Sequence, residues 1–330
     1  MEQCRKSASR PAMLRVALIA FAVASGAPGL ALAASAWPDK PIRIISPWAP
    51  GGSTDFVTRI LGADMSKRLG QSVVIDHRAG AGGIVGMEFA SQQPPDGYTL
   101  MLTSTGYGFI INKAKVDLTT SFVPVSLVGF SDSLLVVHPS LPVKTVKELI
   151  ALAKRRPGQL NYASSGVGGF PHLNTEMFKL MAGVDLVHVP FKGGGPAVAD
   201  NVAGNTQLQL GSLTSSIAMV RSGRLRAIAV GGATRTPLLP DLPTISESGV
   251  PGYESFIWFG LFSPRGTPGP LVASIHSAVM ASLDSPELIK RFDEQGVTIA
   301  RRSTAEFAKL MESETAKWTK VIKAANITGE

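Results

Sequence analysis

Residues 40–55 read KPIRIISPWAPGGSTD, and this stretch decides the fold. Its first part, PIRIIS at 41–46, is a short apolar run typical of a buried strand. A loop rich in proline and glycine follows at 47–52, and Gly70 marks the end of a helix. Between them, apolar residues recur at helical spacing: Val57, Ile60, Leu61 and Met65. A strand that leads through a glycine-rich loop into a helix is the repeating unit of an α/β protein.

The same alternation continues along the chain. Two capping boxes, Thr145 to Glu148 and Ser303 to Glu306, mark helix starts. Further strands are expected over 72–76, 99–105, 134–137, 160–163, 186–191, 206–210, 225–230 and 253–262. This order predicts mixed, mostly parallel sheets flanked by helices. The pattern restarts near 131 and near 251, which predicts two lobes: a discontinuous lobe one (34–132 and 253–330) and lobe two (133–252).

The first 33 residues have the parts of a secretory signal peptide. Arg5, Lys6, Arg10 and Arg15 give a basic start, 16–25 is an apolar run, and Ala31 to Ala33 is a small-x-small cleavage pattern. The apolar run is shorter than the roughly 20 residues that cross a bilayer. Cleavage after Ala33 or after Ala36 fits equally well, and an uncleaved anchor is the alternative. We expect an exported, periplasmic protein.

Composition excludes several classes of site. The only cysteine, Cys4, lies in the signal peptide, so residues 34–330 have no disulfide and no thiolate metal site. The net charge of +8 falls to +5 without residues 1–33, and the basic residues are scattered rather than clustered as on a nucleic-acid surface. The glycine run at 80–86 does not complete a dinucleotide fingerprint, because Val85 takes the last glycine position. We expect no metal, no cofactor and no nucleic-acid partner.

Two loops have the composition of an anion site, PGGSTD at 50–55 and SSGVGG at 164–169. In open parallel sheets, ligands bind beyond the carboxyl ends of strands. The helix after each loop directs free N–H groups and a positive dipole end at the loop. Glycine lets the backbone approach a ligand, and serine and threonine add hydroxyl donors. Composition alone fits ordinary turns just as well.

Eight segments occur in an order that resembles the extracytoplasmic solute receptors of the tripartite tricarboxylate transporter system, the Bug or TctC family. They are 40–55, GAGGIVG (80–86), PDGYTL (95–100), NYASSG (161–166), HVPFKG (188–193), RLRAIAV (224–230), LPDLPTISESGVPG (239–252) and the last helix, 307–318. The resemblance implies a type II periplasmic-binding fold whose interlobe cleft holds a small carboxylate through main-chain amides, hydroxyls and waters. It also implies delivery to the membrane permease subunits of such a transporter.

Carried over, the resemblance points to ligand-binding residues in both lobes. They are Gly51, Gly52, Ser53 and Thr54 in lobe one, and Ser164, Ser165, Gly166 and Gly168 in lobe two. Ser104 and Thr105 are further cleft candidates, although the family segment that follows them is replaced by NKAKVDLTT at 112–120. Gly211 stands where many members have an aspartate, which favours a more anionic or bulkier ligand.

Three other residues have two interpretations each, and three more have one favoured interpretation. Trp48 and Phe170 either stack on a ring of the ligand or pack the hinge side of the cleft. Lys192 either brings positive charge to the cleft rim or is an ordinary surface lysine. Asp55 is expected to favour its helix dipole rather than contact ligand. His172 and His188 are expected to be structural, because no further metal ligands lie at suitable spacing.

These observations predict a monomeric binding protein rather than an enzyme. Two alternatives remain. A sensory receptor for a membrane kinase would have the same fold and differ only in its partner. A secreted serine hydrolase would use Ser164 or Ser165 as nucleophile with a histidine base, an arrangement that no motif of this sequence assembles.

Overall fold

The computed structural model describes residues 37–329, which lie within one compact unit, 36–330. The predicted signal peptide and both cleavage positions lie outside the described residues. The strands are β1 (Ile42–Ser46), β2 (Val73–His77), β3 (Thr99–Ser104), β4 (Phe122–Val137), β5 (Asn161–Ser164), β6 (Val187–Pro190), β7 (Leu208–Ser212), β8 (Arg226–Val230), β9 (Phe256–Pro264) and β10 (Thr298–Ile299).

The helices alternate with these strands, as the sequence predicts. They are α1 (Ser53–Leu69), the short 3-10 helix η1 (Ala81–Gly83), α2 (Ile84–Ser91), α3 (Gly108–Ile111), α4 (Val146–Arg155), α5 (Phe170–Ala182), α6 (Gly194–Ala203), α7 (Leu213–Arg221), α8 (Gly269–Leu283), α9 (Pro286–Glu294) and α10 (Thr304–Ala324). Gly70 and Gly183 end α1 and α5 in the left-handed conformation, as expected for helix C-termini. Among the described residues, no helix has the length and apolarity needed to cross a membrane.

One strand path runs through the described residues in the order β2-β1-β3-β9-β4-β7-β5-β6. The outer pairs, β1 with β2 and β3, and β5 with β6 and β7, are parallel. The central strands β4 and β9 are antiparallel to their neighbours. The α/β prediction is therefore confirmed, and the sheet is mixed because its two outer parts meet on antiparallel central strands.

Strand β4 is much longer than the expected 134–137, because it begins at Phe122. The expectation was wrong because polar residues interrupt the apolar run, although two of the serines have partners far along the chain. Ser126 Oγ lies 2.6 Å from His276 Nδ1, and Ser133 Oγ lies 2.6 Å from Ser255 Oγ. Pro124, which cannot donate to a ladder, sits where the register with β9 shifts.

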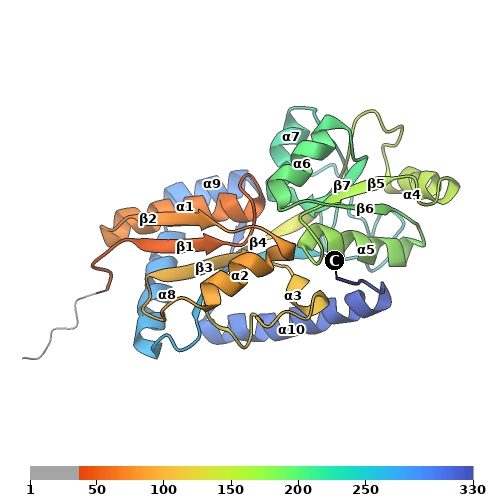
Figure 1. The fold of residues 1–330 in the computed structure, drawn as a ribbon. Coiled ribbons are helices and arrows are strands. Elements are labelled where there is room, and N and C mark those ends of the chain that lie inside the picture. The colour runs from red at the N-terminus through yellow and green to blue at the C-terminus, as the bar shows by residue number, and fades with distance from the viewer. Residues whose placement is uncertain (1–36, 330) are drawn as a thin grey trace, which may run out of the picture. The chain divides into compact units, whose positions relative to one another are not determined.

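Strand β4 joins the two parts of the sheet. Its residues up to Asp132 pair with β9, and from Ser133 onward it pairs with β7 and β8. Figure 1 shows β4 passing between the α1, α2, α8 and α9 side and the α4 to α7 side, with α10 running along both. Helix α10 contacts both β4 and α5. A capping box of Ser303 and Glu306 starts α10, as predicted. At α4, Thr145 caps the helix, while the Glu148 carboxylate accepts from the Lys144 amide rather than from Thr145.

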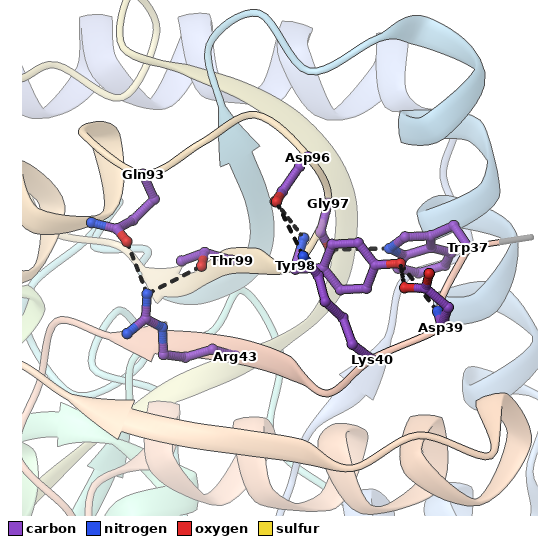
Figure 2. Close-up of polar contacts among 9 residues, drawn as sticks. All are labelled: Trp37, Asp39, Lys40, Arg43, Gln93, Asp96, Gly97, Tyr98 and Thr99. Carbon is purple, nitrogen blue, oxygen red and sulfur yellow. Dashed lines mark hydrogen bonds and ion pairs between the residues drawn. The ribbon is translucent and has the colours of Figure 1, made fainter. Parts of the chain in front are cut away.

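The first described residues are tied to the turn before β3 (Figure 2). The Trp37 indole donates to the Gly97 carbonyl at 3.2 Å, and the Tyr98 hydroxyl donates to Asp39 at 2.6 Å. Arg43, in β1, donates to the Gln93 amide oxygen at 2.8 Å. These contacts fix the entry of β1 beside β3, and so fix the loop that β1 presents to the pocket described next.

Candidate functional site

A pocket lies where helices α1, α5, α6 and α7 begin, at the ends of β1, β3, β5 and β7. The empty space between its lining residues is about 420 Å³, a figure that includes some open solvent. The lining residues are Trp48, Gly52, Ser53, Thr54, Asp55, Ser104, Thr105, Ser165, Phe170, Pro171, Gly194, Gln209, Ser212, Ser215 and Ile257. Eight of the thirteen predicted site residues are in this wall, and four of them come from the two predicted loops: Gly52, Ser53, Thr54 and Ser165.

The start of α1 forms the first side of the pocket. Gly52 is the N-cap residue, and no side chain caps this helix end. The first N–H groups of α1 therefore have no side-chain acceptor and carry the positive end of the helix dipole. Thr54 Oγ1 lies 2.8 Å from Ser104 Oγ, which ties α1 to the end of β3 within the wall. This side presents donors to whatever occupies the pocket.

Asp55 is the only carboxylate in the wall, and its charge is already balanced. Its two oxygens accept from the Gly51 amide at 2.9 Å and from Arg59 Nε at 2.8 Å. His77 Nε2 also lies 3.0 Å from the carboxylate. The predicted role in the first turn of α1 fits these contacts, and the side chain also reaches the pocket surface.

The start of α5 forms the second side, through Ser165, Phe170 and Pro171. Gly169 is the N-cap residue of α5, and no side chain caps this helix end either. The loop before it is held by internal hydrogen bonds: the Gly166 amide donates to Ser164 Oγ at 3.1 Å, and the Gly168 amide donates to His172 Nδ1 at 3.0 Å. Ser164, Gly166 and Gly168 therefore shape the loop, and the structure does not place them in the wall.

A serine–histidine pair lies beside this loop, between the buried Ser164 at the end of β5 and the partly buried His188 of β6. Ser164 Oγ lies 2.5 Å from His188 Nε2, and the His188 ring stacks on His172 with centroids 3.9 Å apart. Burial lowers the pKa of His172 to about 4, and burial together with His172 lowers that of His188 to about 3. Ser164 is fully buried, does not line the pocket and bonds to its own loop. The pair thus has the spacing of a nucleophile and base but no access to a pocket substrate.

The third side, at the start of α7, was missed by the sequence analysis. Gln209, Ser212 and Ser215 line the pocket from β7 and the first turn of α7. Ser212 is the N-cap residue, and no side-chain bond caps this helix. The signal was present in the sequence, since a strand followed by SLTSS at 212–216 repeats the strand, hydroxyl and helix order of the other two sides.

Aromatic side chains close the pocket without any cationic group. Trp48 is 6% exposed, and its indole nitrogen donates to Thr103 Oγ1 at 3.3 Å. Phe170 packs edge-on against Trp318 of α10, with centroids 6.5 Å apart. No lysine, arginine or histidine is among the lining residues, and no cluster of three or more metal-ligating side chains occurs in residues 37–329. Apart from the paired Asp55 carboxylate and the apolar side chains, negative charge in the pocket would meet helix ends, hydroxyls and one amide.

Backbone hydrogen bonds join the loops around the pocket, which we call its rim. The Ala49 amide donates to the Lys192 carbonyl at 3.1 Å, and the Tyr107 amide donates to the Gly168 carbonyl at 2.8 Å. A Cβ atom on Gly52 would lie 3.3 Å from the Cα of Gly194. Gly51 belongs to this rim rather than to the wall. Lys192 lines a neighbouring hollow with the glycine run at 80–83, so the structure does not place it in the pocket.

The comparison with known families decides the identity. The model of the tripartite tricarboxylate transporter family receptor, TctC, matches residues 57–327. The chain belongs to this family. The TctC assignment confirms the resemblance drawn from the sequence, and the mixed α/β architecture is that of periplasmic binding proteins of the TctC and Bug type. The chain has the solute-binding role of that family, whose members are receptors rather than enzymes.

Relatives of this TctC receptor match it along almost their whole length. Protein BugT of Bordetella pertussis is 32% identical over 313 residues, which cover 93% of this chain and 96% of BugT. Rpa4515 of R. palustris, solved with adipate, is 37% identical with a TM-score of 0.85, covering 88% of this chain and 99% of that one. MatC from Rhodopseudomonas palustris, solved with bound malate, is 31% identical with a TM-score of 0.83, covering 86% and 99%.

Proposed function

We propose that this TctC receptor captures a small carboxylate in the pocket between the starts of α1, α5 and α7 and delivers it to the permease subunits of a tripartite tricarboxylate transporter. The observation that carries the proposal is the convergence of three helix N-termini without side-chain caps on one wall whose only acid is already paired. The relatives solved with adipate and malate support the same ligand class.

The free energies of these interactions are large enough for binding without an arginine that holds the carboxylate. A helix N-terminus stabilises an anion by about 0.3–1 kcal/mol, and by up to about 2 kcal/mol when partly buried. Hydrogen bonds to a charged group contribute about 1.5–3 kcal/mol each. Several such contacts, less the cost of association, reach the roughly −8 kcal/mol of a micromolar complex.

The direct test is isothermal titration of the mature chain with a panel of di-, tri- and aromatic carboxylates. Each acid is matched with its methyl ester, which keeps the shape and removes the charge. We expect micromolar binding of at least one acid and none of its ester. A folded protein that binds no acid, or binds ester and acid equally, would contradict the proposal.

We further propose that the two lobes are 34–132 with 253–330, and 133–252, and that β4 and β9 form the hinge between them. The change of partner along β4, from β9 at Asp132 to β7 at Ser133, supports this division. Hinge binders close on their ligand. The radius of gyration from X-ray scattering should therefore fall when a bound acid is added, and an unchanged radius would count against the hinge.

The proposal also covers the export of the chain, its oligomeric state and its membrane partner. Residues 1–33 act as a signal peptide, and the mature receptor works as a monomer in the periplasm. Mass spectrometry of the protein from periplasmic extract tests the cleavage, and light scattering tests the monomer. Cross-linking in the presence of ligand should recover permease subunits, whereas recovery of a membrane kinase alone would assign a sensory role instead.

A further inference from the structure

Gln209 is the most unusual residue of the pocket wall. Its side chain is fully buried, yet neither Nε2 nor Oε1 has a hydrogen-bond partner among the described residues. Buried polar groups are almost always paired in folded proteins, so an amide with both atoms unpaired requires an explanation. Gln209 lines the same pocket as the starts of α1 and α5. A ligand in that pocket is the partner that would satisfy both atoms.

Gly211 makes room for this amide. Residues 209 and 211 of β7 lie on the same face of the strand, and the backbone of Gly211 pairs with Leu134. A Cβ atom on Gly211 would lie 3.2 Å from both Cδ and Nε2 of Gln209, closer than ordinary packing allows. The absence of a side chain at 211 therefore lets the Gln209 amide lie over this part of the strand, where it faces the pocket.

The hydroxyls at the start of α7 already have acceptors for their protons. Thr214 Oγ1 donates to Ser131 Oγ at 2.9 Å, Ser212 Oγ donates to the same oxygen at 3.4 Å, and Ser215 Oγ donates to the Ser212 carbonyl at 2.8 Å. Among the described residues, the one charged side chain that lines the pocket is Asp55, at the start of α1. The Gln209 amide is therefore the group here that offers both a free donor and a free acceptor.

We propose that Gln209 selects carboxylates whose far end carries an uncharged group that both donates and accepts a hydrogen bond, a terminal carboxamide or hydroxyl. This rests on the proposed function, in which the carboxylate head occupies the pocket. A methyl end leaves both amide atoms unpaired. A second carboxylate pairs with Nε2 only, places its oxygens against Oε1, and adds a second charge to a wall without cations.

The test compares four five-carbon acids that share one head group: glutaramate, 5-hydroxypentanoate, pentanoate and glutarate. By isothermal titration at pH 7.5, the unaltered mature chain should bind glutaramate and 5-hydroxypentanoate at least about tenfold more tightly than the other two. In Gln209→Leu the preference should fall below about threefold, while pentanoate binds as before. Removal of an unpaired buried amide should leave the melting temperature unchanged or raised.

Two further variants make the test specific. Gln207→Leu removes an amide next to β7 whose oxygen already accepts from the Asn161 amide at 2.8 Å, and it should keep the preference. In Gly211→Ala the new Cβ displaces the Gln209 amide without removing it, so the preference should weaken. This variant replaces Gln209→Leu in the test if Gln209→Leu fails to fold. Equal binding of all four acids by the unaltered chain, or a full preference retained in Gln209→Leu, would overturn the role of Gln209. Failure to bind any acid would instead overturn the proposed function as well.

Discussion

Gly52 and Gly194 lie so close that a Cβ atom added to Gly52 would be only 3.3 Å from the Cα of Gly194. Two glycine-rich loops therefore meet backbone to backbone at the pocket. Gly52 has φ −90° and ψ 177°, an extended conformation that any residue adopts. The space between the loops, rather than the backbone angle, therefore requires glycine at this position. A side chain here would hold the loops apart and leave the start of α1 folded.

Gly52→Val is expected to lower ligand affinity at least 100-fold while the melting temperature of the unliganded protein changes by no more than a few degrees. The valine side chain blocks the approach of Gly194 without straining α1. Titration and thermal unfolding measure the two effects. Gly269→Val is the control, because a Cβ at that helix start meets no atom within 4 Å. A fall in stability as large as the fall in binding would make Gly52 a structural turn residue.

Thr54→Val should weaken both ligand binding and the fold, each by about 1–3 kcal/mol, because Ser104 loses its partner within the pocket wall. Thr58→Val is a matched change one turn along α1. Its hydroxyl donates to the Thr54 carbonyl at 2.6 Å and does not line the pocket. We expect Thr58→Val to affect the melting temperature alone. Equal loss of ligand affinity in the two variants would remove Thr54 from the site.

The stacked histidines predict a loss of stability in acid. The unfolded chain takes up a proton on each histidine near pH 6.5, whereas the native pKa values of His172 and His188 are lowered to about 4 and about 3. Their contribution is therefore complete above pH 6.5 and is lost as the pH falls below it. For one such buried histidine the loss between pH 7.5 and pH 5 is about 2 kcal/mol.

Urea unfolding at these two pH values measures that loss. His172→Gln, which keeps an acceptor for the Gly168 amide, should make the difference in unfolding free energy smaller by about 2 kcal/mol. His138→Gln, at a surface histidine bonded to Ser140, should leave the difference as it is. If His172→Gln has the same pH dependence as the unaltered protein, the stacked pair is not the source of the acid sensitivity.

Trp48 should report on the pocket through its fluorescence, since it lines the wall and its indole is bonded to Thr103. Ligand should change the emission of the unaltered protein, and Trp48→Phe should abolish most of that change while the affinity stays within about tenfold. Trp37→Phe, at the anchored chain start seen in Figure 2, should keep the signal. A ligand-induced change that survives in Trp48→Phe would place the ligand away from this ring.

Local patterns predicted the elements better than their pairing. Strand–loop–helix order, glycine stops and the Ser303 cap are local properties, and these predictions are confirmed. Strand β4 was predicted too short because Ser126 and Ser133 are buried beside partners more than 100 residues away. No property of the local sequence reveals such a partner. A buried strand whose polar residues are paired by long-range hydrogen bonds therefore has the local pattern of an exposed segment.

The site shows the same limit. Gly52, Ser53 and Thr54 were predicted from a loop that meets a helix start, and the structure places them in the wall. Their binding role stays a prediction, as does that of Ser165 and Phe170. The sequence alone did not distinguish residues that shape a loop, such as Ser164 and Gly168, from those that face the pocket. The sequence did not predict Gln209 as a pocket residue, because a single glutamine in a strand forms no motif. The position of its amide also depends on the absence of a side chain at Gly211.

The pocket wall contains no histidine, lysine or arginine. A receptor built this way recognises an anion through helix ends, hydroxyls and an amide, which do not gain or lose protons between mildly acidic and mildly alkaline pH. Under the proposed function, the affinity for a fully ionised acid should therefore stay even from about pH 6 to 9.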